Sequence, residues 1–455
     1  MYQGSITYIS VCFYIAVKKK SMTTVNYPSL SLRGNALATN PARIDFEIFM
    51  EAAQNLYCPD TNPGGAFPLN VAENHLSAAS VKNVLSSILK QNDIPDWVMA
   101  YTDLLGNSTV REEIARFMGN HLCKCPISSE TIGISAGASA IIELSSFVLA
   151  NPEDVVVIPA PSYPMYTNDM GLKSGMQRYN LPTHYDFNEI GPEAPLKLEL
   201  LDQALNDLKA QDRRFRILLI TSPDNPTGCR YTEAQLRKLA SWCIQHEIHM
   251  IVNEIYGLSL IDTTNDEPGE SYVSFAKIMQ DFNSDYLHLW YAFSKDFAMS
   301  GLRIGVVHSL NPAFIKGFEN ANVPHMVSNL AQWALAELLK KKDFIDSYLI
   351  ENKKRIQQAY QLVAGTLEEV GLPYLPSKGS FFLWVDFSKF LKEDSEAGEE
   401  QLWLDIYRNT GILLTPGIGF GHQKKGLFRM VFTAVPYSHL EVAMERMSEY
   451  LLGRT

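Results

Sequence analysis

The amino-acid sequence predicts an α/β protein with a mostly parallel central sheet and a second, α+β domain near the C-terminus. The first observation is a set of short apolar runs, rich in β-branched and aromatic residues, of the kind that forms buried strands. They lie at residues 154–161, 215–223, 249–256, 286–294 and 302–309. The second observation is that helical patterns separate these runs, and alternating strands and helices favour a parallel sheet. The third is that the residues after position 323 lack this alternation, which indicates a separate domain.

The clearest helical pattern follows Thr232. Thr232 and Gln235 have the spacing of a capping box, and apolar residues then recur on one face. A long charged helix is predicted at 343–370. It precedes three apolar segments, at 379–388, 411–417 and 427–435. Together they indicate the α+β arrangement of the second domain.

Length and charge narrow the class of protein. The chain has 455 residues, of which 46% are hydrophobic and 20% charged, so it is long enough for a large core and two domains. Its net charge of −11 argues against the basic surface that binds nucleic acid. The six cysteines are scattered, which predicts reduced thiols in a cytoplasmic protein.

An apolar run near the N-terminus needs a separate interpretation. The run ITYISVCFYIAV, at 6–17, is shorter than the roughly 20 residues of a membrane-spanning helix. Lysines follow it, whereas a secretory signal carries its positive charge before the apolar run. We expect residues 1–24 to be an unstructured extension, with Met22 as an alternative start, and we expect no membrane partner. A membrane anchor is the alternative.

The stretch YAFSKDFAMSGLRIG, at 291–305, contains a candidate reactive lysine. It places Lys295 in an otherwise apolar run, with Arg303 eight residues on. Desolvation at the end of a buried strand lowers the pKa of a lysine, and a neutral amine forms Schiff bases. The alternative is a lysine whose ammonium group reaches solvent. This stretch by itself leaves both interpretations open.

Other motifs favour the first interpretation. In SAGASAIIEL, at 135–144, small residues occur where a strand meets a helix, so that backbone N–H groups there can hold an anion. If that anion is a phosphate, Arg303 could add a bidentate contact to it. Arg429 is isolated in the apolar run LFRMVF, where its planar group could clamp a carboxylate. Three more motifs each offer one side chain for binding: Tyr163 in PSYP, Asn225 in SPDNPTG and Tyr256 in VNEIYG.

The order of these motifs resembles the class I/II aminotransferase family of pyridoxal 5′-phosphate (PLP) enzymes, from about residue 45 to 450. The resemblance implies fold type I, a mostly parallel central sheet with helices on both faces and a smaller α+β domain. It also implies a homodimer. The large PLP-binding domain is expected at 81–322, and the small domain at 25–80 and 323–455. A finer resemblance, of NPGGAFPLNVAEN at 62–74 and FSKDFAMSGLRIG at 293–305, is to the 1-aminocyclopropane-1-carboxylate (ACC) synthase-like branch.

The resemblance implies a role for each motif residue. Lys295 would form a Schiff base with PLP and then act as the base at the substrate Cα. The other cofactor-binding residues implied are Ala138, Ser139 and Arg303 at the phosphate, Tyr163 on the ring, Asn225 and Tyr256 at the 3-oxygen, Asn253 at the ring nitrogen, and Tyr101, which would reach the phosphate of a neighbouring subunit. The implied substrate-binding residues are Arg429, at the α-carboxylate, and Glu73. Lys295, Tyr256 and Asn253 would be catalytic.

Two departures from the family pattern affect the expected chemistry. The family has an aspartate at the position of Asn253, and a neutral amide cannot stabilise a protonated pyridine nitrogen by charge. Glu254 should not replace it, because adjacent strand residues point to opposite faces. We therefore expect a slower enzyme, or different chemistry. Leu104 stands where ACC synthases carry a tyrosine that takes part in elimination, which weakens that assignment.

The sequence thus predicts a PLP-dependent enzyme that acts on an α-amino acid, with transamination to a 2-oxo acid as the first expectation. One alternative is ACC synthase-like α,γ-elimination on S-adenosylmethionine. Another is a non-catalytic relative that binds PLP or an amino acid, because of Asn253. The spacing of His, Cys and Asp residues predicts no metal site.

Overall fold

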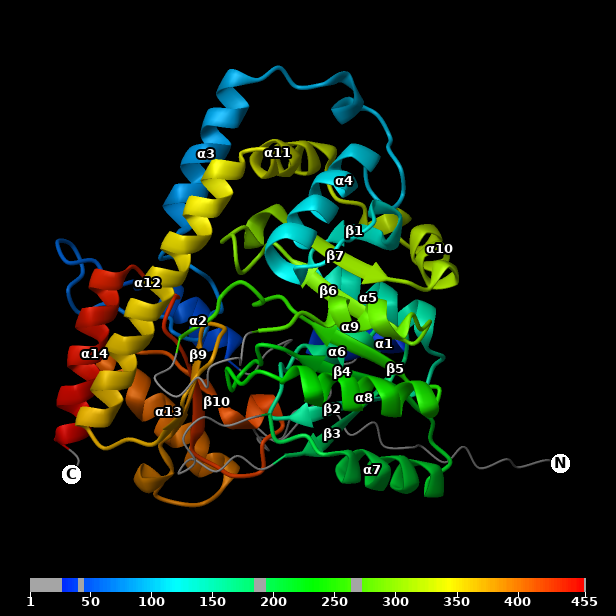
Figure 1. Ribbon diagram of the computed structural model, residues 1–455. Coiled ribbons are helices and arrows are strands. Elements are labelled where there is room, and N and C mark those ends of the chain that lie inside the picture. The colour runs from blue at the N-terminus through cyan, green and yellow to red at the C-terminus, as the bar shows by residue number, and fades with distance from the viewer. Residues whose placement is uncertain (1–26, 40–44, 184–193, 263–271, 454–455) are drawn as a thin grey trace.

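The computed structural model describes residues 27–39, 45–183, 194–262 and 272–453, and the predicted extension at 1–24 lies outside them. Figure 1 shows two bodies of secondary structure, each built around its own sheet, with the long helix α12 (Lys342–Glu369) reaching from one to the other. None of the helices in the described ranges combines the length and apolar character that crossing a bilayer requires.

The larger sheet has seven strands in the order β1-β7-β6-β5-β4-β2-β3. Their bounds are β1 (Ile132–Ala136), β2 (Val155–Ala160), β3 (Gln177–Pro182), β4 (Phe215–Thr221), β5 (His249–Asn253), β6 (Leu287–Ala292) and β7 (Ile304–Ser309). The pairs β2–β3, β2–β4, β4–β5 and β5–β6 are parallel, whereas β7 runs antiparallel to β1 and β6. The five predicted runs form β2, β4, β5, β6 and β7, and the mostly parallel sheet is confirmed.

Two strands were not predicted, for different reasons. β1 carries glycine and serine, and its pattern is less apolar than that of its neighbours. β3 lies at the sheet edge and is only partly buried, so its polar residues gave no buried-strand signal.

Helices cover both faces of the larger sheet (Figure 1). Successive residues of one strand enter different cores: Ile217 and Leu219 of β4 face one, and Leu218 and Ile220 face the other. The helices around this sheet are α3 (Ala78–Gln91), α4 (Ser108–Phe117), α5 (Ala138–Leu149), α6 (Tyr166–Gly171), α7 (Leu198–Ala210), α8 (Glu233–Gln245), α9 (Phe275–Phe282), α10 (Pro312–Ala321) and α11 (Asn329–Leu339). The predicted capping box of α8 is present, with Thr232 and Gln235 in both of its hydrogen bonds.

The smaller sheet is antiparallel, in the order β10-β11-β9-β8. Its strands are β8 (Tyr374–Leu375), β9 (Phe382–Asp386), β10 (Thr415–Pro416) and β11 (Leu427–Val431). It shares a core with part of α12, with α13 (Glu396–Thr410) and α14 (Tyr437–Leu452), and with residues from α2 (Phe46–Ala53) and 66–69. The remaining helix, α1 (Leu32–Thr39), has no buried residue. The predicted α+β body is confirmed, and it draws in chain from far upstream.

Candidate active site

Lys295 lies in the turn after β6, and its neighbour anchors that turn. The buried carboxylate of Asp296 accepts hydrogen bonds from Ser259 Oγ at 2.6 Å, the Leu258 N–H at 3.1 Å and Tyr291 Oη at 3.1 Å. Burial raises the pKa of Asp296 to about 7. The Lys295 amine is thereby directed to the segment 69–76, where Nζ donates to the carbonyl of Ala72 at 2.5 Å.

Glu73 lies within electrostatic range of that amine. His75 Nε2 is 3.0 Å from Glu73 Oε2, and this contact, opposed by burial, is the main cause that lowers the pKa of Glu73; Lys295 lowers it further. Both Glu73 and His75 keep nearly half of their side-chain surface exposed. A half-buried carboxylate therefore faces the lysine from the segment that carries the AEN motif.

The start of α5 packs against the guanidinium of Arg303 and forms a corner that could hold an anion. Gly137 precedes the helix at φ 86°, and a Cβ added to it would lie 2.4 Å from Arg303 Nη2, so the guanidinium packs where only glycine fits. Ala138 and Ser139 open the helix, where unpaired N–H groups and the helix dipole favour an anion. Asp169 of α6 interacts with Ser139 and Arg303, and burial raises its pKa to about 7.

Asn253 ends β5 and its amide is held at both ends. The Ile255 N–H donates to Oδ1 at 3.2 Å, and Nδ2 donates to Tyr166 Oη at 2.9 Å. A backbone N–H can only donate, so the oxygen must face Ile255 and the amide presents donors on its other side. Glu254 points elsewhere, because it accepts bonds from Ser274 and Phe275 at the start of α9.

Arg429 of β11 reaches across to the larger body. Its Nη1 donates to Asn225 Oδ1 at 2.9 Å, and its Nη2 donates to the carbonyl of Asn70 at 2.6 Å. The guanidinium carbon lies 4.6 Å from the ring centroid of Phe382 and 5.1 Å from that of Phe420, so two aromatic faces flank it. Because arginine only donates, Asn225 presents its NH₂ group away from Arg429.

Two tyrosines connect these groups. Tyr256 is buried, and its hydroxyl interacts electrostatically with Arg429, with Tyr163 and with Asp296 beside the lysine. Burial raises the pKa of Tyr256, and Arg429 opposes that rise. Tyr163 packs edge-on against Tyr166, with ring centroids 5.2 Å apart. The structure therefore gathers Tyr163, Asn225, Tyr256 and Arg429 in one region.

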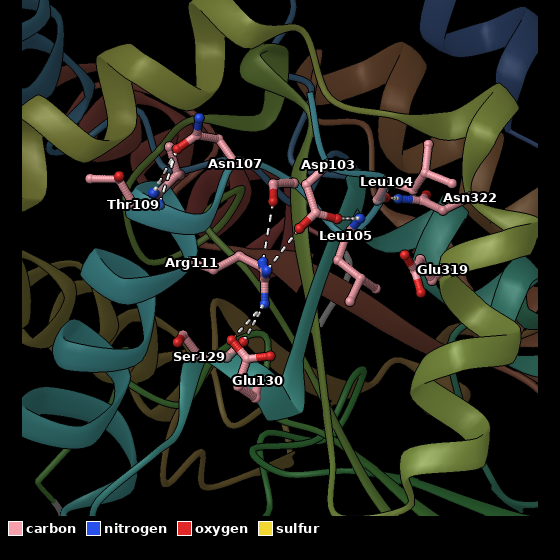
Figure 2. A network of polar contacts seen from close by, with 12 residues as sticks. Asp103, Leu104, Leu105, Asn107, Thr109, Arg111, Ser129, Glu130, Glu319 and Asn322 are labelled. Atoms are coloured by element: carbon pink, nitrogen blue, oxygen red, sulfur yellow. Dashed lines mark hydrogen bonds and ion pairs between the residues drawn. The ribbon is translucent and has the colours of Figure 1, made fainter. Parts of the chain in front are cut away.

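Tyr101 is different, because its side chain is fully exposed. Figure 2 shows how Arg111 of α4 bonds the segment that follows Tyr101 in the chain. Arg111 is buried and bonds Asp103 Oδ2 at 3.0 Å, and Asn322 Nδ2 donates to the Leu104 carbonyl at 2.6 Å. The fold of a single chain therefore fixes the segment 103–107 without bringing the exposed Tyr101 ring to the other predicted site residues.

Several contacts at the site gave no usable sequence signal. Ala72 and Asn70 act through backbone carbonyls, which any residue type provides. Tyr166 and Asp169 are polar residues on a short helix, and only the fold places them beside Asn253 and Arg303. Phe420 is an aromatic residue upstream of Arg429, but the loop between them sets its distance from the guanidinium.

The sequence was compared with known families and proteins. The sequence model of the family described as aminotransferase class I and II matches residues 68–447. The chain belongs to this family. Aminotransferases of class I and II use PLP, so the predicted cofactor is confirmed, as is the predicted family.

Relatives and solved structures of the family extend this result. A 1-aminocyclopropane-1-carboxylate synthase 1 of rice (Oryza sativa subsp. indica) is 30% identical, over 90% of this chain and 85% of the relative. A mouse (Mus musculus) protein named "probable inactive 1-aminocyclopropane-1-carboxylate synthase-like protein 2" is 28% identical, over 93% of this chain and 72% of the relative. Aspartate aminotransferase from Thermus thermophilus, solved with maleate, is 20% identical with a TM-score of 0.75, over 93% of this chain and 100% of that chain. The last likeness confirms the predicted fold.

The residues of this aminotransferase-family chain fit a phosphate-bearing aldehyde. Gly137 leaves the Arg303 guanidinium in place at the start of α5, which suits a phosphate. Lys295 supplies an amine, and Asn225 and Asn253 each present a fixed amide donor to another partner. The described residues contain no group of His, Cys, Asp and Glu suited to a metal ion.

Proposed function

We propose that this chain is a PLP-dependent enzyme that acts on an α-amino acid and transfers its amino group, leaving a 2-oxo acid. The observation that carries the proposal is that the segment 69–76 accepts hydrogen bonds from both the Lys295 amine, at the Ala72 carbonyl, and Arg429, at the Asn70 carbonyl. Asp296 anchors the turn of the lysine, and two aromatic rings flank the arginine. An anchored amine and a rigid carboxylate clamp are what an α-amino acid needs for reaction at Cα.

The residues divide this work as follows. When bound, PLP supplies the electron sink that stabilises charge left at Cα. Lys295 would hold the aldehyde end until the substrate amine takes its place, and the released Lys295 amine would then take the Cα proton. Arg303, Ala138 and Ser139 would hold the phosphate. Asn225 and Tyr256 donate to the ring oxygen, Tyr163 covers the ring, and Asn253 donates to the ring nitrogen. Arg429 binds the α-carboxylate.

ACC synthase-like elimination on S-adenosylmethionine is the second candidate. The observation that favours it is the position of Glu73, whose carboxylate lies within electrostatic range of Lys295. A negative charge there suits a substrate with a positive charge beyond Cα. The names of the plant relatives point the same way. Leu104, in place of a tyrosine, favours transamination instead.

A non-catalytic binding protein is the candidate from another class. Asn253 supports it, because the amide lacks the charge that would stabilise a protonated ring nitrogen. The name of the mouse relative, which describes that protein as probably inactive, also supports it. A protein of this class would bind PLP at Lys295 and release neither product.

We also propose a cytoplasmic homodimer in which Tyr101 serves the neighbouring site. Met99 and Tyr101, two positions apart in the chain, are both almost fully exposed although one is apolar and the other aromatic. A contiguous exposed apolar patch is typical of a surface that binds another protein chain.

Spectroscopy and product analysis test these candidates together. Purified protein with PLP should absorb visible light, and borohydride should fix a pyridoxyl group on the peptide that contains Lys295. Lys295→Ala should bind no PLP covalently and should lose activity by about a thousandfold. With amino acids, a 2-oxo acid and pyridoxamine phosphate indicate transamination, whereas methylthioadenosine from S-adenosylmethionine indicates elimination. Wild-type protein without an adduct at Lys295 would refute the proposed function.

A further inference from the structure

We propose that Tyr348 and Asn352 of α12 are positioning residues for Lys295, and that Asn74 couples them to the segment the lysine faces. This inference rests on the proposed function, because it takes Lys295 as the amine that holds the cofactor. It assigns a role to three buried side chains, none of which is among the predicted cofactor-binding or substrate-binding residues.

The first link runs from α12 to the turn of the lysine. Tyr348 Oη donates to the Asp296 carbonyl at 2.8 Å, and Asn352 Nδ2 donates to the same carbonyl at 3.5 Å. Tyr348 also stacks on Phe297, with ring centroids 5.2 Å apart. The peptide group between Asp296 and Phe297, one residue beyond Lys295, is therefore held by two residues one helical turn apart, and the shorter bond comes from Tyr348.

The second link runs from α12 to the segment 69–76. Asn74 Nδ2 donates to Asn352 Oδ1 at 2.8 Å, and both side chains are almost completely buried. Arg355, three residues on, donates from Nη1 to the Leu76 carbonyl at 2.7 Å. The direction of the Asn bond follows from chemistry: the Asp296 carbonyl can only accept, so Asn352 must turn its NH₂ to it and its oxygen to Asn74.

The third link joins the same segment to the strand of Arg429. Thr433, two residues beyond β11, is bonded on both sides: its Oγ1 donates to the Glu73 carbonyl at 2.7 Å, and its carbonyl accepts from the His75 N–H at 2.9 Å. The Val431 N–H donates to the Leu69 carbonyl at 2.9 Å. The segment 69–76 thus lies between the carboxylate clamp and the lysine, and it is bonded to both bodies.

These links make a closed loop around the lysine amine. Nζ bonds the carbonyl of Ala72, Asn74 bonds Asn352, and Asn352 and Tyr348 bond the carbonyl of Asp296. If the α12 contacts are lost, the turn and the segment can move relative to each other, and the amine loses its fixed position. A small misplacement of a reacting group costs far more rate than its effect on stability suggests.

The test uses full-length protein stripped of cofactor. Its variants are Tyr348→Phe, which removes only the hydroxyl, Asn352→Leu, Asn74→Leu and the double Asn74→Leu/Asn352→Leu. We expect Tyr348→Phe and Asn352→Leu to slow PLP capture at Lys295, followed by absorbance, by about tenfold. The pH midpoint of the bound cofactor's absorption should shift in both. Because the two asparagines act through one bond, the double variant should be no slower than the slower single variant.

Gln358→Leu is the matched control, since Gln358 is an exposed amide on the same helix, and it should leave both readouts unchanged. The inference would be overturned if Tyr348→Phe and Asn352→Leu captured PLP at rates within twofold of wild type, with pH midpoints equal to that of wild type within error. A lower melting temperature in these variants would then indicate a purely structural role. If an asparagine variant fails to fold, Tyr348→Phe decides alone. Wild-type protein that captures no PLP at all would instead refute the proposed function.

Discussion

At the residue scale, Asn253 is the departure with the clearest chemical consequence. Its amide oxygen accepts from the Ile255 N–H, so the side chain offers only N–H donors to Tyr166 and to a cofactor ring. A donor pairs with an unprotonated ring nitrogen, whereas a carboxylate pairs with a protonated one. If Asn253 contacts the cofactor ring as proposed, the fixed amide would select a neutral ring, which draws electrons from Cα less strongly.

Replacing that amide by a carboxylate tests the argument. We expect Asn253→Asp to raise turnover by about tenfold and to change the absorption spectrum with substrate, because a carboxylate stabilises the protonated ring nitrogen. The measurement is kcat together with the spectrum of the substrate-bound protein. Glu254→Gln is the control, since Glu254 faces α9, and it should change neither. Identical spectra and turnover in Asn253→Asp and wild type would contradict this account.

At the element scale, the neighbouring strands β5, β6 and β7 each contain one buried histidine. His249 of β5 and His288 of β6 lie with Nδ1 and Nε2 3.0 Å apart, and His308 of β7 bonds the Thr131 carbonyl. Burial lowers the pKa of all three, and for His249 the charges of Arg216 and Arg214 lower it further, to about 3. The fold therefore holds these histidines in the neutral form, in the strands that carry Asn253 and lead to Lys295.

The buried pair gives a pH dependence with a definite sign. His249 binds a proton in the unfolded chain below about pH 6.5 but not in the folded chain until about pH 3. Its contribution to stability is therefore complete above pH 6.5 and is lost as the pH falls toward 3. We expect urea unfolding to show that, as the pH falls from 6 to 4, the free energy of unfolding of His249→Gln rises relative to that of wild type. The rise should be at most about 1.4 kcal/mol per pH unit.

Exposed His246, close by in the sequence, provides the comparison for this series. His246→Gln removes a histidine that is exposed, so a gain at low pH that is larger in His249→Gln than in His246→Gln would be due to burial of the imidazole. A difference between His249→Gln and wild type that does not change with pH would show that the histidine is not held neutral by the fold.

At the scale of the whole molecule, the site is divided between two bodies and requires contacts from distant parts of the chain. Figure 1 shows α12 extending from beside α11 to α14, and its 28 residues span about 42 Å. Arg429 comes from the smaller sheet and Asn225 from the larger body. The Ser162 N–H donates to the Phe420 carbonyl at 3.0 Å, which adds a second contact between the bodies beside Tyr163.

The exposed Tyr101 leads to a prediction about assembly. If Tyr101 completes the site of a neighbouring subunit, a mixed dimer of Lys295→Ala and Tyr101→Ala contains one intact site. We expect coexpression of the two variants, with different affinity tags, to restore about half of the wild-type cofactor capture per dimer. Each variant alone should be defective. A mixed dimer of Lys295→Ala and Asn225→Ala is the control, because both residues belong to the same chain's site, and it should restore nothing. Failure of the first mixture would place Tyr101 outside the site.

The sequence by itself determined most of the strands, the family and the identity of most groups with chemistry. Apolar runs and a capping box depend on local patterns, and the motifs around Lys295, Asn225 and Arg429 are contiguous, so a linear reading finds them. Only the tertiary structure decided which groups meet. The Ala72 carbonyl at Lys295, Tyr166 at Asn253 and the bonds of Tyr348 and Asn352 to the Asp296 carbonyl join residues tens to hundreds of positions apart. Such contacts follow from the packing of two bodies around α12, and no short-range pattern encodes them.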